Sequence, residues 1–103
     1  MSLQSSLLTT TAANVYVSSG QTAAMTFYFS NYSASQNATF SLWAVKSGQT
    51  AGNVNVLYSN VVVQAGDTYL ADTERIILDN NDALVAYTNV NSTMSVTLTY
   101  TSV

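Results

Sequence analysis

All the carboxylate side chains of this chain lie between positions 67 and 82, and this clustering is the first feature that could support catalysis. A glycosidase with two catalytic carboxyl groups needs them to face each other across a sugar cleft, one of them with a raised pKa. A domain of 103 residues leaves little mass for such a cleft, and Asp beside a turn most often bonds the local backbone. Turn capping and solvation are therefore favoured over catalysis for Asp67, Asp72, Glu74, Asp79 and Asp82.

The segment Asp79-Asn80-Asn81-Asp82 also offers oxygen ligands of the kind that Ca²⁺ prefers. It lacks the Asp-x-Asp-x-Asp-Gly spacing and the distant bidentate Glu of a calcium-binding loop. Asn and Asp are common in turns because they bond their own main chain and tolerate left-handed backbone angles. We therefore expect a hydrogen-bonded turn at 79–82, with calcium binding as the alternative.

The chain has no His and no Cys, so a hydroxyl nucleophile would have to use Lys46 as its base. The residue three positions before Lys46 is Trp43, so there is no Ser-x-x-Lys arrangement. Without His or Cys, zinc, copper and iron lose their best ligands. The sequence predicts that the protein is not an enzyme, and we assign it no catalytic, cofactor-binding or metal-ligating residue and no cofactor.

Aromatic side chains offer another chemistry, because a ring with an apolar face and a polar rim can stack on a sugar. Trp43 and seven Tyr are present. Tyr32 falls in an expected loop, and Tyr28 and Trp43 fall on the strand faces opposite the phenylalanines. Packing between strands is the favoured interpretation of these rings, and a glycan-binding platform is the alternative.

Charge and hydropathy exclude two classes of partner. Lys46 and Arg75 are the only basic residues, too few to neutralise a run of phosphates, so nucleic-acid binding is excluded. Wholly apolar runs are short, as at Val61-Val62-Val63, whereas a membrane helix needs about 20 residues. The opening residues 1–8 have no basic region and no long apolar core, so we expect neither a signal peptide nor a membrane partner.

Hydrophobicity alternates with a period of two in several stretches, which is typical of strands buried on one face. In the clearest case Met94, Val96, Leu98 and Tyr100 alternate with Ser and Thr. The pattern predicts an all-β fold, a two-sheet antiparallel β-sandwich of the Ig-like or jelly-roll-like kind. About eight strands are expected, near Ser6–Ala12, Val15–Val17, Thr22–Ser30, Ala38–Val45, Val54–Val63, Thr68–Ala71, Ile76–Leu78 continued by Leu84–Thr88, and Thr93–Thr101.

We expect a single sandwich domain over residues 15–103, preceded at 1–14 by an N-terminal extended arm or a first strand. Asp72-Thr73-Glu74-Arg75 could form one helical turn, since Asp is a good N-cap residue. The chain has no Pro and one Lys, the residues that usually protect sheet edges from pairing with other chains. Its edges must therefore be short or covered, most simply by another copy of the chain. The predicted core consists of Phe27, Phe29, Phe40, Leu42, Ile76, Leu78, Leu84, Val96 and Leu98.

The stretch Ser59–Tyr69, with Ala65-Gly66-Asp67-Thr68 inside it, is followed by Ile76–Leu84, in which Leu78 precedes Asp82 by four positions. This order of strand, turn, strand and Leu-x-x-x-Asp, before a closing strand rich in Val and Thr, resembles small structural proteins of tailed bacteriophages. The resemblance covers roughly Ala23 to Val103. Such proteins are all-β, lack Cys and serve as decoration, cement, neck or tail components, so there are no catalytic residues to carry over.

The resemblance implies a virion structural protein, located in the virion, that binds the capsid or tail surface in many copies. The implied partners are the protein itself, as a homo-oligomer, and other virion proteins such as the major capsid or tail proteins. The alternative function is a phage adhesin or carbohydrate-binding module, in which Trp43 and loop tyrosines would contact a host glycan.

Overall fold

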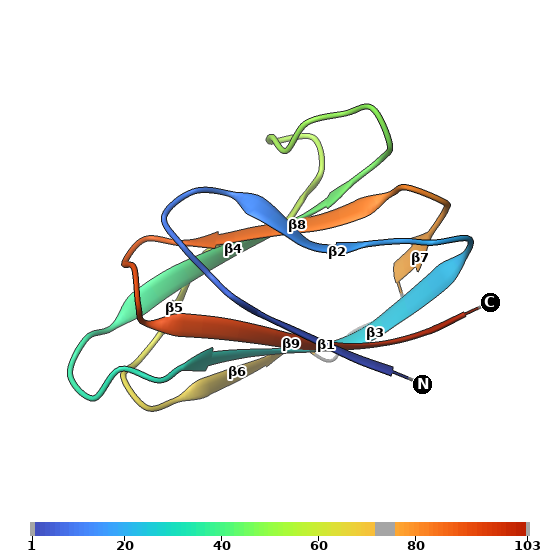
Figure 1. The fold of residues 1–103 in the computed structure, drawn as a ribbon. Coiled ribbons are helices and arrows are strands. Elements are labelled where there is room, and N and C mark those ends of the chain that lie inside the picture. The colour runs from blue at the N-terminus through green and yellow to red at the C-terminus, as the bar shows by residue number, and fades with distance from the viewer. Residues whose placement is uncertain (1, 72–75, 103) are drawn as a thin grey trace.

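The computed structural model describes residues 2–71 and 76–102, apart from the side chain of Met25. The helical turn expected at 72–75 lies outside the described residues. Within them the chain forms nine β-strands and no helix, arranged as two antiparallel sheets stacked face to face (Figure 1). The predicted all-β, two-sheet sandwich is therefore confirmed.

Each sheet contains strands that are far apart in the chain. The five-stranded sheet has the order β1-β9-β3-β6, and β7 also pairs with β3; the four-stranded sheet has the order β2-β8-β4-β5. The five-stranded sheet consists of β1 (Ser2–Leu7), β9 (Met94–Ser102), β3 (Thr22–Asn31), β6 (Thr68–Ala71) and β7 (Ile76–Leu78). The four-stranded sheet consists of β2 (Ala13–Val17), β8 (Ala83–Thr88), β4 (Ala38–Val45) and β5 (Val56–Val63).

The first strand is not where the sequence pattern put it. The prediction was Ser6–Ala12, whereas β1 spans Ser2–Leu7. The reason is that the chain changes sheets after β1: the Leu8 N–H donates to the Met94 carbonyl in one sheet, and the Thr9 carbonyl accepts from the Thr88 N–H in the other. Residues 9–12 connect the sheets and form no strand.

Two further strand predictions need correction. Ile76–Leu78 and Leu84–Thr88 were expected to form one interrupted strand, but they are β7 and part of β8, which lie in different sheets. The turn at 79–82 carries the chain from one sheet to the other. The strand predicted from Val54 begins at Val56 instead, because Val54 is almost fully exposed in the preceding loop.

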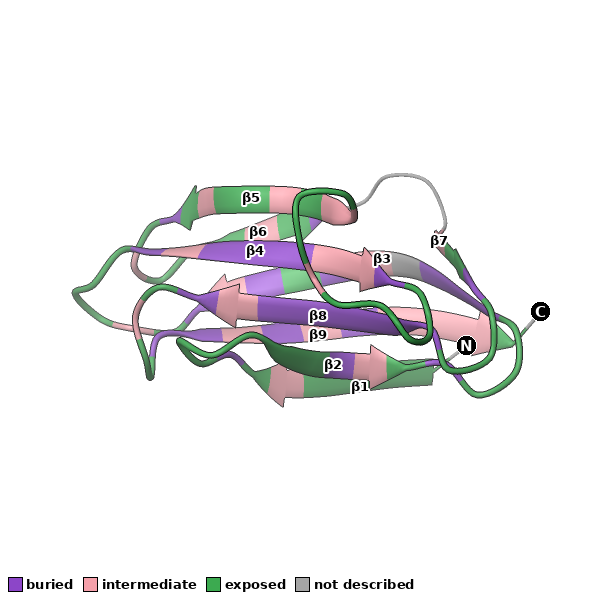
Figure 2. Ribbon diagram, turned by 90° about the horizontal axis from the view of Figure 1, so that it is seen from above, coloured by how far each residue is buried: buried purple, intermediate pink, exposed green. Residues whose placement is uncertain are grey.

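The core lies between the two sheets and is built from the inward faces of their central strands (Figure 2). At its centre the rings of Phe29 in β3 and Phe40 in β4 stack with centroids 3.7 Å apart and planes 7° from parallel, which joins the sheets. Every predicted core residue is buried except Ile76, which is half-buried. Ile76 lies in the short β7, beside an open hollow of about 300 Å³ that Lys46 also lines, so the edge of the sandwich leaves it partly uncovered.

Asn31, at the end of β3, is a polar member of the interior. Its side chain is 2% exposed. Its amide Nδ2 donates to the carbonyls of Gln36 and Val63 at 2.8 and 2.9 Å, and its Oδ1 accepts from the Ser33 N–H at 3.0 Å. Because Val63 ends β5 in the opposite sheet, this one amide ties both sheets to the loop at 32–37.

The turn between β5 and β6 contains the sequence Ala65-Gly66-Asp67. The Asp67 N–H donates to the Gln64 carbonyl at 3.0 Å, and Gly66 has a φ of 80°. A four-residue turn with a positive φ at its third position favours Gly there, because a Cβ is strained in that conformation. The turn is anchored to β3, since Asn31 exchanges backbone hydrogen bonds with Gly66 and Asp67.

Candidate functional site

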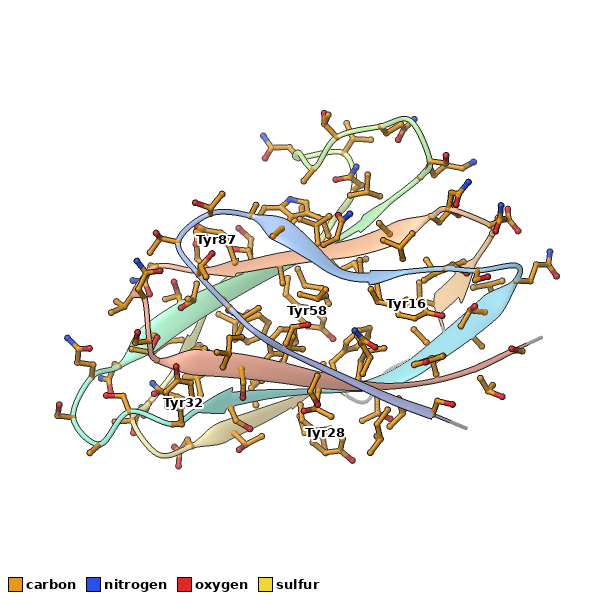
Figure 3. All side chains as sticks on the ribbon, viewed as in Figure 1. Tyr16, Tyr28, Tyr32, Tyr58 and Tyr87 are labelled. Atoms are coloured by element: carbon orange, nitrogen blue, oxygen red, sulfur yellow. The ribbon has the colours of Figure 1, made fainter. Side chains whose placement is uncertain are left out.

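The outer face of the five-stranded sheet carries a group of exposed apolar side chains. They are Leu3 (68% exposed), Leu7 (70%), Tyr28 (41%), Leu70 (51%) and Ile77 (55%). The strands that hold them, β1, β3, β6 and β7, bring together residues from both halves of the chain. Figure 3 shows Tyr28 pointing away from the interior, whereas Tyr16 and Tyr58 lie between the sheets. We call these five residues the outer apolar group.

The strand register places the outer apolar group among hydroxyl side chains. Directly paired residues share a face of the sheet, and Tyr28 pairs with Leu70 on one side and Thr97 on the other. Thr97 in turn pairs with Ser5, and their hydroxyl oxygens lie 3.0 Å apart. The remaining side chains that alternate onto this face from β1, β3, β6 and β9 are Ala23, Thr26, Ser30, Thr68, Ser95, Thr99 and Thr101. Among the described residues of these strands, this face bears no charge.

The open edges of the two sheets differ in regularity. The pairing of β2 shifts register between Asn14 and Tyr16, and that of β5 shifts twice, with Asn60 at a φ of 52°. Strands β6 and β7 are short, with four and three residues. By contrast, β1 pairs with β9 over six successive residues without a shift. Bulges and short strands protect an edge from further pairing, so β1 is the edge that remains suited to it.

The outer face of the four-stranded sheet holds the sequence-predicted Trp43. Its ring is half-buried and stacks on Tyr87, with centroids 5.7 Å apart, and the Tyr87 hydroxyl donates to Asn60 Oδ1 at 3.3 Å. The loop at 46–55 arches away from this sheet (Figure 1). A shallow hollow of about 380 Å³ lies between that loop and the strand residues Asn14 and Val85.

The other predicted aromatic candidates are divided between packing and exposure. Tyr16 stacks on Tyr100 with centroids 4.6 Å apart, and Tyr58 packs edge-on against Tyr69. Tyr28 and Tyr32 are exposed, but they do not join Trp43, because Tyr28 projects from the opposite sheet. The packing interpretation therefore describes most of these rings, and a platform would be limited to Trp43 and Tyr87.

Among the described residues, the carboxylates that cluster in the sequence do not form a catalytic pair. Asp82 Oδ1 accepts from the Ser47 N–H and Oδ2 from the Asp79 N–H, each at 3.0 Å. Asp67 is exposed in the β5–β6 turn, and Asp72 and Glu74 lie outside the described residues. No group of three or more potential metal-ligating side chains occurs in residues 2–71 and 76–102.

The segment at 79–82 is a hydrogen-bonded turn, as the first of the two interpretations predicted. The Asp82 N–H donates to the Asp79 carbonyl at 3.0 Å, and Asn81 adopts a φ of 70°. The turn is fastened to the β2–β3 turn, since Asn80 Oδ1 accepts from the Gly20 N–H at 2.9 Å. Both carboxylate oxygens of Asp82 are used by backbone N–H groups, so this Asp serves as a cap.

The N–H groups of Ser47 and Asp79, and to a smaller degree the charge of Lys46, hold the pKa of Asp82 below its ordinary value of 3.8 against the opposing effect of burial. A carboxyl group with a lowered folded-state pKa stabilises the fold above its unfolded pKa, and that stabilisation is lost as the pH falls through the folded value.

We therefore expect the melting temperature to fall on acidification below about pH 4, and Asp82→Asn to melt lower than the parent at pH 7 with a weaker pH dependence. Thermal melts from pH 7 to pH 2 measure both effects. Asp67→Asn is the matched control, because only the backbone of Asp67 is seen to bond. Equal acid slopes for the parent and Asp82→Asn would contradict the expectation.

Comparisons with protein-family models, curated proteins and solved structures found no significant match. The described residues contain no helix that is long and apolar enough to cross a membrane.

Sequence reasoning missed most of the outer apolar group. Leu7 and Leu8 are adjacent apolar residues, but their side chains lie on opposite faces, with Leu8 in the core and Leu7 exposed. The available signal was the alternation of Leu3, Ser5 and Leu7 in the first residues. Leu70 and Ile77 could not be recognised without the pairing of β6 and β7 with β3.

Proposed function

We propose that this protein is a non-enzymatic virion structural protein of a tailed bacteriophage. It would act as a decoration, cement, neck or tail component that binds the capsid or tail surface in many copies. The observation that carries the proposal is the uncharged outer face of the five-stranded sheet, where the outer apolar group lies among Ser and Thr hydroxyls. The resemblance of residues 59–84 to small phage structural proteins supplies the biological setting.

Such a face suits a permanent contact with another protein surface. Burial of its apolar side chains would contribute about 25 cal/mol for each Å² removed from water. Its hydroxyls lose little on desolvation if they find partners across the interface. A formal net charge of −3 over the whole chain opposes close approach of copies only weakly, because physiological salt screens exposed charges within about 8 Å.

The experiment is mass spectrometry of purified phage particles together with a surface variant. We expect the parent protein in many copies per particle, and Leu70→Lys, which places a charge in the outer apolar group, to be incorporated poorly. Val62→Lys is the control, because Val62 is 62% exposed on β5, in the other sheet. Absence of the parent from the particles, or equal incorporation of both variants, would overturn the proposal.

One observation favours a second function, that of an adhesin or carbohydrate-binding module. The Trp43–Tyr87 stack, with Asn60 hydrogen-bonded at its edge, offers a ring surface and an amide of the kind that sugars contact. A glycan array with the parent and Trp43→Ala distinguishes the two functions. Glycan binding that depends on Trp43, together with a low copy number at a tail tip, would put the adhesin first.

A further inference from the structure

The backbone of β1 directs half of its hydrogen-bonding groups out of the molecule. The Leu8 N–H donates to the Met94 carbonyl at 2.9 Å, so Leu8 and Met94 form a hydrogen-bonded pair. In an antiparallel ladder such pairs alternate with pairs whose N–H and C=O groups point away from the partner strand. Continuing the register of β1 with β9, the backbone groups of Leu3, Ser5 and Leu7 therefore point to the open edge.

The residues on that edge have a pattern that matches its own reverse. Around Ser5, the sequence reads Leu3, Gln4, Ser5, Ser6, Leu7, with leucine two positions away on either side. Antiparallel pairing of two such strands about Ser5 sets Ser5 opposite Ser5 and Leu3 opposite Leu7. Leu3, Ser5 and Leu7 all alternate onto the outer face of the sheet, and all three are exposed.

We infer that two copies of this chain pair through β1, antiparallel and in register at Ser5, around a two-fold axis. The five-stranded sheets of the two copies then form one continuous sheet. This inference rests on the proposed function, in which many copies of the chain assemble. The partner that binds the β1 edge is a second copy of the chain.

Three properties of the edge support this pairing. The outward N–H and C=O groups of Leu3, Ser5 and Leu7 supply about six hydrogen bonds between the copies. Leu3 and Leu7 are the most exposed members of the outer apolar group. Leu3 of each copy would lie against Leu7 of the other, so the two-fold axis gives two such leucine pairs. No charged residue lies within β1, so no like charges meet at the axis. An interface of this kind is self-complementary, as a two-fold contact must be.

The register is tested by disulfide trapping, because the parent chain has no Cys and a single introduced thiol can bond only to another chain. Directly hydrogen-bonded partners have Cα atoms about 5.5 Å apart, within the disulfide range of about 4.4–6.8 Å. With a mild thiol oxidant such as diamide, we expect Ser5→Cys to run mostly as a covalent dimer on non-reducing gels.

Other positions define the controls. Two Cys at position 3 would lie about 14 Å apart across the axis, so Leu3→Cys alone should form no covalent dimer. A mixture of Leu3→Cys and Leu7→Cys should give a covalent heterodimer, because positions 3 and 7 lie opposite each other. Thr97→Cys places the thiol beside Ser5 but one strand inside the edge and should stay monomeric. Dimers of Ser5→Cys no more abundant than those of Thr97→Cys would overturn the inference.

A second measurement needs no thiol. In light scattering at high concentration we expect the parent to be dimeric. Ser5→Lys should raise the dissociation constant of the dimer roughly fivefold, because two ammonium groups meet at the axis. Thr97→Lys should have the same dissociation constant as the parent. A strictly monomeric parent contradicts the pairing. If that parent were still abundant in phage particles, the pairing would fail while the proposed function stands.

Discussion

Phe29→Ala is expected to cost about 3–5 kcal/mol of folding free energy, because it removes one half of the ring stack that joins the two sheets. The Phe29 side chain is fully buried, and the packing around Phe40 cannot close a space of that size. Total stabilities of small domains are about 5–15 kcal/mol. We therefore expect a drop in melting temperature of roughly 15 °C or more, measured by circular dichroism or calorimetry.

The matched control is the neighbouring residue. Tyr28→Ala removes a ring of similar size from the outer face, where Tyr28 is 41% exposed, and should cost no more than about 1 kcal/mol. If Phe29→Ala melted like the parent while Tyr28→Ala unfolded, the faces of β3 would be inverted, which is what a register slip of one residue produces.

Asn31→Leu is the second substitution with a large expected effect, and it should lower the free energy of unfolding by about 3 kcal/mol or more. It leaves the buried carbonyl of Val63, the Gln36 carbonyl and the Ser33 N–H without their hydrogen-bond partner. Leucine has the same branching and the same number of side-chain heavy atoms as asparagine but a larger volume, so tight packing at this buried site adds to the cost of the lost hydrogen bonds. Chemical denaturation with the fraction folded followed by fluorescence gives the free energy of unfolding.

Two further variants separate hydrogen bonding from composition at this site. Asn31→Asp keeps an acceptor for Ser33 but replaces the amide donor with oxygen facing two carbonyls, so it should be about as damaging as Asn31→Leu. Asn37→Leu removes one hydrogen bond to the Ala65 N–H at an exposed position and should cost about 1 kcal/mol. Equal stabilities for Asn31→Leu and Asn37→Leu would show that the amide does not join the sheets.

The sequence predicted those parts of the fold that depend on local alternation. The strands Ala38–Val45 and Thr68–Ala71 have the predicted bounds, and β9 differs by one residue at each end. In β4 and β9 one face is mostly apolar and the other carries Ser and Thr, so a period of two is visible along them. The inward residues Phe27, Phe40 and Leu98 followed from the same alternation.

The rest depends on pairing between distant residues, which no local pattern contains. Ser2 lies opposite Tyr100, and only this pairing shows that Leu3 and Leu7 belong to an exposed sheet face. The predicted strand ends at Ser30 and leaves Asn31 outside it, and the burial of Asn31 follows from the meeting of β3 with the end of β5. The outer apolar group likewise could not be assembled from the sequence, because β1, β3, β6 and β7 contribute to it separately.

The position of β9 in the five-stranded sheet has a consequence for synthesis of the protein. β9 is the last of the nine strands along the chain, yet it lies between β1 and β3. Until residues 94–102 have left the ribosome, β1 and β3 have no common neighbour and the sheet has no centre. Chains are made at about 5–20 residues per second, so the first strand waits several seconds for its partner. The five-stranded sheet can therefore form only after β9 has been made, and a chain cut short before β9 lacks the strand that holds the β1 edge in place.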